Sequence, residues 1–377
     1  MPRIAVLGQI GLLSAMVLVL TGSGFASGFA PPVIYPADQG PNFVTIGAFN
    51  RDGKTDLAVT NLLSNDVSVL IGNGDGTFQP AVNYPVGISP TGVTELCSRA
   101  SLHVENLAVV NSGSDTVSVL IGNGDGTFQP AVEYSLGTGK SPRAVLMGDF
   151  NLDGSCDLAI ANASGGSNNN GNIAILLGNG DGTLGPASNY DTLGVEPVAL
   201  TVGGYNNDVF SDLAVANFAS NSVTIFLGNG QGGFTASGDY PTGVGPSSIT
   251  GFFESSSALN LVTANSGSNN ITELYGADDG TFPHSKNLPV GTMPVSLTVG
   301  IFNQSNILLD IAVANEGDST ISALLGQSKR PYLRKPATFA TCSSPQSVVT
   351  IDANLDGKED LVVACAEGVG VMLNTGP

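Results

Sequence analysis

The chain has 377 residues, with 12 Lys+Arg against 31 Asp+Glu and a formal net charge of −19. A surface this acidic repels phosphate backbones and anionic bilayers, which argues against nucleic acid and stable membrane docking. It is compatible with bound divalent cations, and equally with acidity that only keeps an exported protein soluble. The 50 Gly and 21 Pro stand mostly between short apolar runs, which is typical of many short strands.

Residues 1–26 have the pattern of an export signal. Arg3 gives a short basic start, residues 4–20 are almost entirely apolar, and small residues follow, with cleavage predicted after Ala26. We therefore expect a secreted or cell-envelope protein without stable membrane insertion after signal removal, and a monomer. An uncleaved anchor is the alternative, because the apolar run is near the lower length limit of a membrane span.

From residue 31 onward, one strand-like segment recurs seven times. Its copies read DLAVTN, NLAVVN, DLAIAN, DLAVAN, NLVTAN, DIAVAN and DLVVAC, and they close on Asn61, Asn111, Asn162, Asn217, Asn265, Asn315 and Cys365. A proline keeps the same step at Pro41, Pro90, Pro142, Pro197, Pro246, Pro294 and Pro345. A period of about 50 residues of short strands indicates a propeller. We predict an all-β fold over residues 31–377: a seven-bladed β-propeller of four-stranded blades.

The two ends of the repeated region are complementary. The last repeat finishes with GVGVMLNTGP, which supplies only a third strand, whereas PPVIYPAD at residues 31–38 resembles the fourth-strand segments AVNYPVG and AVEYSLG. We expect residues 33–35 to complete the last blade. This would close the ring and cover edges that otherwise invite aggregation.

Two loops between first and second strands carry similar sets of oxygen-bearing side chains. Ca²⁺ takes about six to eight oxygens, and alternate positions of a tight loop can supply them, as in a shortened EF-hand loop. The alternative is a hairpin of Asx turns whose carboxylates accept backbone N–H groups. The predicted Ca²⁺ ligands are Asp149, Asn151, Asp153, Ser155 (backbone carbonyl) and Asp157, then Asp352, Asn354, Asp356, Lys358 (backbone carbonyl) and Asp360.

The same loop is incomplete in the other blades. In the first and fourth repeats Ala48 and Gly204 replace the first ligand, and only weak binding is predicted. The weak ligand sets are Asn50, Asp52 and Asp56, then Asn206, Asp208 and Asp212. Loops 98–106, 252–260 and 301–310 have lost most ligands, and no metal is predicted there.

The sequence GNGDGTF occurs at 72–78 and 122–128, with close variants in later repeats. A phosphate cradle would need a helix after the glycines, but another strand follows here. Gly and Asn supply the positive φ of tight hairpins, so we predict a structural turn. A minor cation role for Asp75, Asp125 and Asp181 is the alternative.

Four cysteines fit an oxidising compartment, and the repeat favours one of three possible pairings. Cys342 precedes the first strand of the last blade and Cys365 ends its second strand, so both lie at one end of a hairpin. Cys97 and Cys156 map to the opposite end, in neighbouring blades. We predict the pairs Cys342–Cys365 and Cys97–Cys156, with free buried thiols as the alternative.

No catalytic residue is predicted. The two histidines, His103 and His284, lie in different repeats, and neither a G-x-S-x-G elbow nor an HExxH motif occurs. An enzyme acting on extracellular polysaccharide (hydrolase or lyase) and a structural envelope module remain alternatives, because propellers can assemble sites from distant loops. The absence of Trp weakens the carbohydrate enzyme.

Repeats of the form gDfNxDGxxDLaVaN followed by vsvLlGnGdGtF resemble the FG-GAP or VCBS-type family, whose relatives include the integrin α-subunit propellers. The resemblance covers residues 31–377. It implies Ca²⁺ in the loops between first and second strands, and ligand binding on the opposite face. On that face the stretch 164–172 is an insertion: a recognition loop, or a tolerated flexible insertion. We expect a secreted calcium-binding module for an extracellular protein or glycan.

Overall fold

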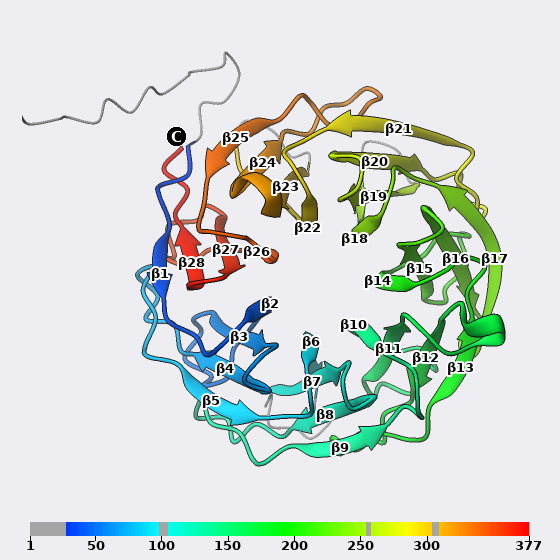
Figure 1. The fold of residues 1–377 in the computed structure, drawn as a ribbon, viewed down its shortest axis with the longest axis horizontal. Helices are drawn as coiled ribbons and strands as arrows, with labels where there is room; N and C mark the ends of the chain where they lie inside the picture. Colours follow the sequence, from blue (N-terminus) through cyan, green and yellow to red (C-terminus); the bar gives the residue numbers. More distant parts are fainter. Residues whose placement is uncertain (1–27, 98–104, 254–257, 304–308, 377) are drawn as a thin grey trace, which may run out of the picture.

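The computed structural model describes residues 28–97, 105–253, 258–303 and 309–376, which form seven four-stranded antiparallel sheets in a ring (Figure 1). The predicted seven-bladed β-propeller is therefore confirmed. In blades one to six the strands follow one another from the centre of the ring to its outer wall, and the chain then enters the next blade. The exported-signal prediction for residues 1–26 falls outside the described residues.

The strand bounds repeat closely from blade to blade. Blade one comprises β2 (Pro41–Gly47), β3 (Asp56–Asn61), β4 (Asp66–Leu70) and β5 (Val82–Pro85). Blade two comprises β6 (Pro90–Cys97), β7 (Glu105–Asn111), β8 (Thr116–Leu120) and β9 (Val132–Ser135). Blade three comprises β10 (Pro142–Gly148), β11 (Asp157–Asn162), β12 (Asn172–Leu176) and β13 (Ser188–Asp191), with a 3-10 helix η1 (Ser167–Asn169) between β11 and β12.

The remaining blades follow the same plan. Blade four comprises β14 (Pro197–Gly203), β15 (Asp212–Asn217), β16 (Ser222–Gly228) and β17 (Phe234–Pro241). Blade five comprises β18 (Pro246–Phe253), β19 (Leu259–Asn265), β20 (Asn270–Tyr275) and β21 (His284–Pro289). Blade six comprises β22 (Pro294–Gly300), β23 (Asp310–Asn315), β24 (Thr320–Leu324) and β25 (Ala337–Ala340), with a 3-10 helix η2 (Glu316–Asp318). Blade seven comprises β26 (Ser347–Ile351), β27 (Asp360–Cys365), β28 (Gly368–Met372) and β1 (Val33–Tyr35).

The repeated proline and the closing asparagine of the sequence pattern pair with each other in the sheet. In blade one Pro41 pairs with Asn61 across β2 and β3, and a register shift follows directly. The same pairing and shift recur in blades two to six. Proline cannot donate to the ladder and is tolerated at a strand's first residue or at a bulge, which explains its fixed position.

The second and third strands form the core of each blade. Every residue of β3 and β4 is buried, although their sequences do not alternate between apolar and polar residues. Such strands pack on both faces, so their apolar runs are nearly continuous. The apolar clusters accordingly lie between adjacent blades; one combines Phe49 and Val69 of blade one with Leu107 and Phe128 of blade two.

The N-terminal segment completes blade seven, as predicted. Strand β1 pairs antiparallel with β28, with Ile34 opposite Gly370. The contact begins earlier than residue 31, because Phe29 forms a β-bridge with Asn374. Its ring packs edge-to-face on Phe302 and Phe339 of blade six, at centroid distances of 5.5 and 5.4 Å.

The glycine-rich turns between third and fourth strands fasten blades one, two, four and five to the preceding blade. Gly126 N donates to Phe49 O at 3.0 Å, and equivalent bonds join Gly76 to Ala353, Gly232 to Phe150 and Gly280 to Tyr205. The ring of Phe128 then packs edge-to-face on Phe49 and Tyr84 of blade one. The turns are therefore structural, and Phe29 takes the position of this aromatic residue where blade seven meets blade six.

Among the described residues, no helix is long and apolar enough to cross a membrane.

Candidate functional site

The loop of blade three for which Ca²⁺ binding is predicted connects β10 to β11, and its side chains turn inward onto its own backbone. We call the loops between first and second strands the cation loops, after this prediction. Asp149 accepts hydrogen bonds from Asp153 N (3.2 Å) and Gly154 N (3.0 Å). Asn151 Oδ1 accepts from Asp153 N at 3.1 Å, and Asp153 Oδ1 accepts from Ser155 N at 2.6 Å. Gly154 has φ 77°, which only glycine adopts readily, so the bend requires this residue.

Blade seven builds the same loop between β26 and β27. Asp352 accepts from Asp356 N (3.1 Å) and Gly357 N (2.9 Å), and Asp356 Oδ1 accepts from Lys358 N (3.0 Å). Asn354 Oδ1 accepts from Asp356 N at 3.2 Å. Two loops about 200 residues apart in the chain thus share one local fold, which follows from their shared D-x-N-x-D-G spacing.

The last predicted ligand of each loop has a structural role. Asp157 is fully buried and accepts from Phe150 N and Gly178 N, both at 2.8 Å. It thereby ties the first loop of its blade to the turn after the third strand. The same two-sided contact is made by Asp56, Asp212, Asp310 and Asp360.

The buried aspartates differ in how strongly other carboxylates act on them. Burial raises the pKa of Asp157. Its two hydrogen bonds from backbone N–H groups act to lower this pKa, and repulsion from Asp153 and Asp149 acts to raise it. Burial also raises the pKa of Asp360, again with a contribution from two neighbouring carboxylates, Asp356 and Asp352. These two loops therefore each concentrate three mutually repelling carboxylates, which a bound cation would relieve.

The arrangement of these groups is not that of a ready-made metal centre. Within the part of the chain that the structure describes, no group of three or more His, Cys, Asp or Glu side chains is gathered closely enough to hold a metal ion. The loop carboxylates aim at backbone N–H groups instead. Cation binding would require several of them to exchange these hydrogen bonds for the ion.

The incomplete loops use other contacts. In blade one Lys54 Nζ lies 3.2 Å from Asp52 Oδ2, so a lysine ammonium already neutralises one predicted weak ligand. Ala48 stands at the first ligand position, and its N–H donates to the Glu105 carboxylate of blade two. Glu359 of blade seven accepts from Ile301 N of blade six in the same way.

In blade four, Asn206 Oδ1 accepts from Asp208 N at 3.2 Å, and Asp208 Oδ1 accepts from Phe210 N at 2.8 Å. In loops 98–106, 252–260 and 301–310, residues 98–104 (including His103), 254–257 and 304–308 lie outside the described residues. In the glycine-rich turns, Asp75, Asp125 and Asp181 each accept from the backbone N–H and hydroxyl of the threonine two residues later.

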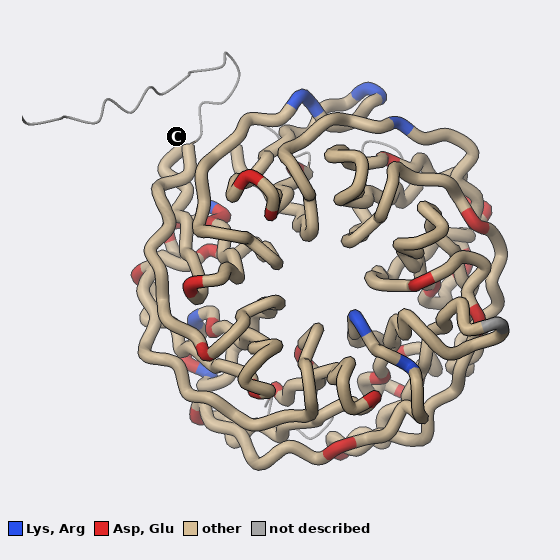
Figure 2. The backbone as a smooth tube through the Cα atoms, viewed as in Figure 1, with Lys and Arg blue, Asp and Glu red and all other residues tan. Residues whose placement is uncertain are grey.

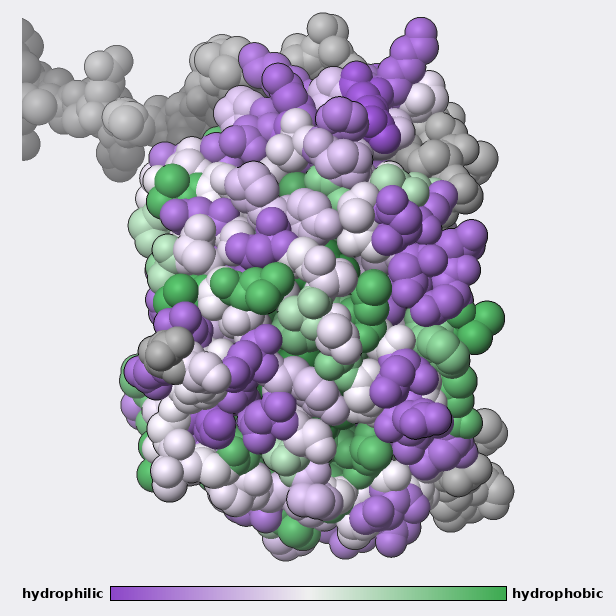
Figure 3. Space-filling view, turned by 90° about the vertical axis from the view of Figure 1, so that its right-hand side faces the viewer, coloured by the Kyte–Doolittle hydropathy of each residue, from purple (hydrophilic) through white to green (hydrophobic). Residues whose placement is uncertain are grey.

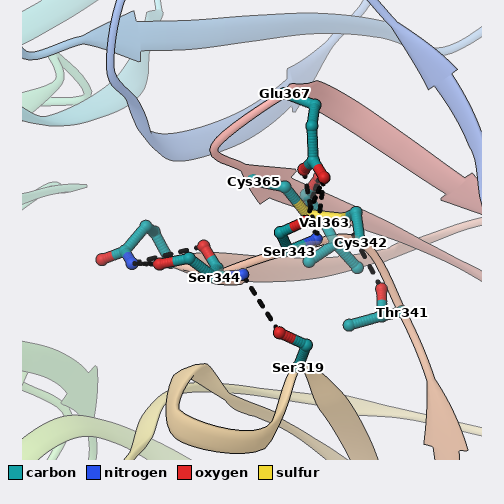
Figure 4. The surroundings of a disulfide bond; sticks show 9 residues. Ser319, Thr341, Cys342, Ser343, Ser344, Val363, Cys365 and Glu367 are labelled. Carbon is teal, nitrogen blue, oxygen red and sulfur yellow. Dashed lines mark hydrogen bonds between the residues drawn. A yellow bond between two sulfur atoms is a disulfide. The ribbon is translucent and has the colours of Figure 1, made fainter.

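The structure joins Cys97 to Cys156 and Cys342 to Cys365, the two pairs predicted from the repeat. The first bond links blades two and three. The second lies where β27 ends, beside the Glu367 carboxylate, which accepts from Ser343 (Figure 4).

The position of the second disulfide follows from the repeat. In other blades the glycine of the inter-blade loop lies against the closing asparagine: a Cβ on Gly87 would meet Asn111 Nδ2 at 2.6 Å. Cys342 and Cys365 stand at these two positions in blade seven. A pair of residues already in close contact needs little backbone movement to be bridged.

The rim opposite the cation loops carries exposed apolar side chains. It is formed by the loops between second and third strands and by the loops between blades. Four of its side chains lie on neighbouring loops around blade four and form what we call the apolar rim patch: Leu193 (56% exposed), Val195 (37%), Phe218 (39%) and Val244 (54%).

The apolar rim patch is continuous across blades. Ala219 N donates to Val195 O at 3.1 Å, and a Cβ on Gly245, the residue after Val244, would lie 3.1 Å from the Phe218 ring. Among the described residues, the other large exposed apolar side chains of this rim lie on other blades: Leu63, Ile88 and Met293.

The inserted loop of blade three adjoins this patch. Asn170 O accepts from Glu196 N at 2.9 Å, next to Val195. Within the loop, Ser167 N donates to Asp191 Oδ1 (3.1 Å) and Gly165 N donates to Asn169 Oδ1 (3.0 Å). The hydrogen bond from the Ser167 side chain to Asp191 lowers the pKa of that carboxyl. The loop is therefore held by side-chain contacts. The patch was not predicted from the sequence, although the repeated G-[VI]-x-P of the inter-blade loops was a usable signal.

Comparisons with known proteins agree with the fold. Residues 106–160 match the model of the FG-GAP-like repeat. No curated protein matches the chain. A structure described as BBS1N in complex with ARL6DN is similar with a TM-score of 0.62 at 13% identity, covering 92% of this chain and 98% of that one.

Two further similar structures are gluconolactonases by description. The periplasmic gluconolactonase PpgL of Pseudomonas aeruginosa has a TM-score of 0.61 at 14% identity, covering 86% of this chain and 88% of its own. A putative 6-phosphogluconolactonase of Bacteroides uniformis has a TM-score of 0.63 at 15% identity, covering 83% and 89%. At such identities the likeness shows the fold alone. The chain is thus a seven-bladed β-propeller in which residues 106–160 match the FG-GAP-like repeat.

Proposed function

We propose that this propeller is an exported binding module that engages an extracellular protein or glycan through the apolar rim patch. The observation that carries the proposal is the patch itself: Leu193, Val195, Phe218 and Val244 are exposed on adjacent loops, beside a loop that only blade three possesses. Contiguous exposed apolar surface with polar residues around it is typical of interaction sites. A protein partner suits the patch better than a glycan, because Phe218 is its only aromatic residue.

The scaffold supports this role. The loops of the patch are fixed by hydrogen bonds to neighbouring blades, such as Val195 N to Ser220 Oγ (2.9 Å) and Gly245 N to Asn221 Oδ1 (2.8 Å). Surface loops held on a rigid framework lose little conformational entropy on binding. The patch is therefore presented in a form ready to dock.

The test is a pair of double variants compared in capture from native extracellular material. Phe218→Ser/Val244→Ser removes two members of the apolar rim patch. Val209→Ser/Leu355→Ser removes two exposed apolar residues from the cation-loop end, which are 84% and 57% exposed. Wild type and the second variant should retain one specific partner, and the first should lose at least about tenfold in affinity. Equal retention by all three proteins would contradict the proposal.

Calcium is proposed as a stabilising ion of blades three and seven. What supports it is the crowding of three carboxylates in each loop and the spacing of their oxygens. Asp149, Asn151 and Asp153 would hold the ion in blade three, with Asp157 and the Ser155 carbonyl. The corresponding holders in blade seven are Asp352, Asn354, Asp356, Asp360 and the Lys358 carbonyl.

This proposal predicts that Ca²⁺ raises Tm and that EGTA lowers it. At about 100-fold excess over Kd each site contributes about 3 kcal/mol, or roughly 4 °C for a protein of this size. Asp149→Asn/Asp352→Asn should abolish the response, whereas Asp125→Asn/Asp181→Asn in the glycine-rich turns should keep it. A Ca²⁺-independent Tm together with no bound metal by elemental analysis would refute the proposal.

Export is supported by the apolar N-terminal segment and by two disulfides, which persist in oxidising compartments. Because Phe29 already takes part in the fold, cleavage after Ala26 would leave the ring-closing segment whole. N-terminal sequencing of the protein recovered from a native host should begin at Ser27. A start beyond Phe29, or an intact signal in the membrane fraction, would contradict this.

A further inference from the structure

The positive charge of this acidic chain is concentrated in one region. Five of its 12 Lys and Arg residues are Lys286, Lys329, Arg330, Arg334 and Lys335. No Asp or Glu occurs in the sequence between Asp279 and Asp310, or between Asp318 and Asp352. The first stretch lies in blades five and six, and the second runs from blade six into the start of blade seven. Together they carry five basic and no acidic residues, a charge opposite in sign to that of the molecule as a whole.

The register of blade five brings these residues together. Strand β21 places His284 opposite Tyr275 and Lys286 opposite Glu273. Directly paired residues of antiparallel strands point to the same face of the sheet. On that face lies the turn of blade six, because Tyr332 packs edge-to-face on Tyr275 at 5.5 Å.

We call the resulting surface the basic patch: His284, Lys286, Lys329, Arg330, Arg334 and Lys335, all of them exposed. Figure 2 shows Lys and Arg gathered on the outer wall over β21 and the chain leading into β25, with most Asp and Glu elsewhere around the ring. The upper end of the side wall in Figure 3, where these strands lie, is mostly hydrophilic.

Buried contacts between blades five and six support the basic patch, and the described parts of the other blades have no equivalent. Glu273 is fully buried and accepts from Tyr332 N (3.1 Å), Leu333 N (2.9 Å) and the Tyr275 hydroxyl (2.6 Å). The Arg330 guanidinium lies 4.4 Å from the centre of the Tyr275 ring. A buried carboxylate with three hydrogen bonds and a cation–π contact holds this turn in place. Here the sequence GQSKRPYL replaces the GNGDGTF turn.

We propose that the basic patch binds a linear acidic polysaccharide through the carboxylate or sulfate groups of its sugars. Basic side chains on a fixed turn attract such groups over short range, and the exposed ammonium groups can follow the spacing of charges along a chain. The site is separate from the apolar rim patch, since it lies on the outer wall toward the cation-loop end. It would anchor the module in an acidic matrix while the rim remains open to its partner.

The net charge of −19 favours binding of a single polyanionic chain over binding of an extended anionic surface. The Debye length at physiological salt is about 8 Å, so only charges near the patch are felt strongly. A single polysaccharide chain can lie along the patch without approaching the acidic remainder of the surface. A bilayer would bring a broad anionic surface close to that remainder and be repelled.

The test measures binding of the full chain to polygalacturonate and dextran sulfate, with unmodified dextran as the neutral reference. Lys329→Gln/Lys335→Gln removes two charges from the patch, and Arg51→Gln/Arg143→Gln removes two exposed charges elsewhere. Both variants change the net charge equally. We expect binding to the two polyanions only, an affinity loss of at least about tenfold for the patch variant, and less than about twofold for the control. The slope of log Kd against log salt should fall by about one per removed contact.

Several outcomes would overturn the proposal. These are equal losses in both variants, no binding to either polyanion, or tighter patch-dependent binding to poly-L-glutamate or to phosphatidylserine vesicles. If Lys329→Gln/Lys335→Gln does not fold, Lys286→Gln/Arg334→Gln makes the same test from neighbouring positions. Because Phe218→Ser/Val244→Ser leaves the basic patch unchanged, it should bind the polyanions like wild type, which separates this proposal from that of the rim.

Discussion

Blade seven and the other six blades reach the same architecture with different residues. In blades one, two, four, five and six the closing asparagine donates to a hydroxyl on the third strand; Asn217 Nδ2, for example, lies 2.9 Å from Thr224 Oγ1. In blade seven the third strand offers Gly368 and Gly370 at these positions, and a disulfide at Cys365 replaces the hydrogen bonds. The fourth strand of blade seven, β1, and the aromatic residue that packs on blade six, Phe29, both come from the N-terminal end of the chain. Blade seven therefore makes contacts at the same positions as the other blades but with different residues. The ring closes at this blade, whose sequence differs most from the repeat.

The largest expected effect comes from removing the closure. Deletion of residues 28–36 removes β1 and Phe29, and it leaves β28 as an open edge with Val369 and Val371, now buried, exposed. We expect loss of a cooperative thermal transition and aggregation, measured by circular dichroism and size-exclusion chromatography. Deletion of residues 1–26 is the control and should leave Tm unchanged. A cooperative, soluble 28–36 deletion would show that six complete blades suffice.

A smaller effect is expected from the disulfide of blade seven. Cys342→Ser/Cys365→Ser releases a cross-link between residues 23 apart and should lower the free energy of unfolding by about 3 kcal/mol. Asn217→Ala in blade four removes the equivalent hydrogen bonds and should cost about 1–2 kcal/mol. Denaturant titrations of both variants make the comparison. If the asparagine variant loses more, the disulfide is not the stronger of the two contacts.

The smallest effect concerns Glu95 on β6. Burial, and then repulsion from Glu105, raises the pKa of this carboxyl to about 7 from its ordinary 4.5. The folded protein therefore holds this proton more tightly than the unfolded chain, and stability falls as pH rises from about 4.5 through 7. Glu95→Gln should leave Tm unchanged near pH 4 and raise it by a few degrees at pH 8. A Tm difference independent of pH would contradict the raised pKa.

The repeat made most of the fold predictable. Pro41 and Asn61, read as parallel markers in the sequence, are direct partners in the sheet, and one period of such pairs defines a blade. Closure by residues 33–35 followed from the missing fourth strand at the other end. The pairing of Cys342 with Cys365 could be inferred because the repeat places both residues at the same end of one hairpin.

The features of the fold and of the site that were not predicted from the sequence depend on contacts between repeats. Nothing near Phe29 in the sequence indicates its packing on Phe302, since the two residues meet only when the ring closes. Likewise Glu105 reaches the loop of blade one from blade two. The apolar rim patch was missed because its members, Val195 and Phe218 among them, are single exposed residues in separate loops. A polar insertion drew attention to the same rim but not to these side chains.

Hydrogen–deuterium exchange with and without the captured partner would show directly whether the partner binds the apolar rim patch. We predict that exchange slows most at residues 193–196, 218–221 and 243–245, and to a smaller extent in the inserted loop at 163–171. Slowed exchange at the cation loops or along the first strands of the blades, with these segments unchanged, would contradict a binding role for the apolar rim patch.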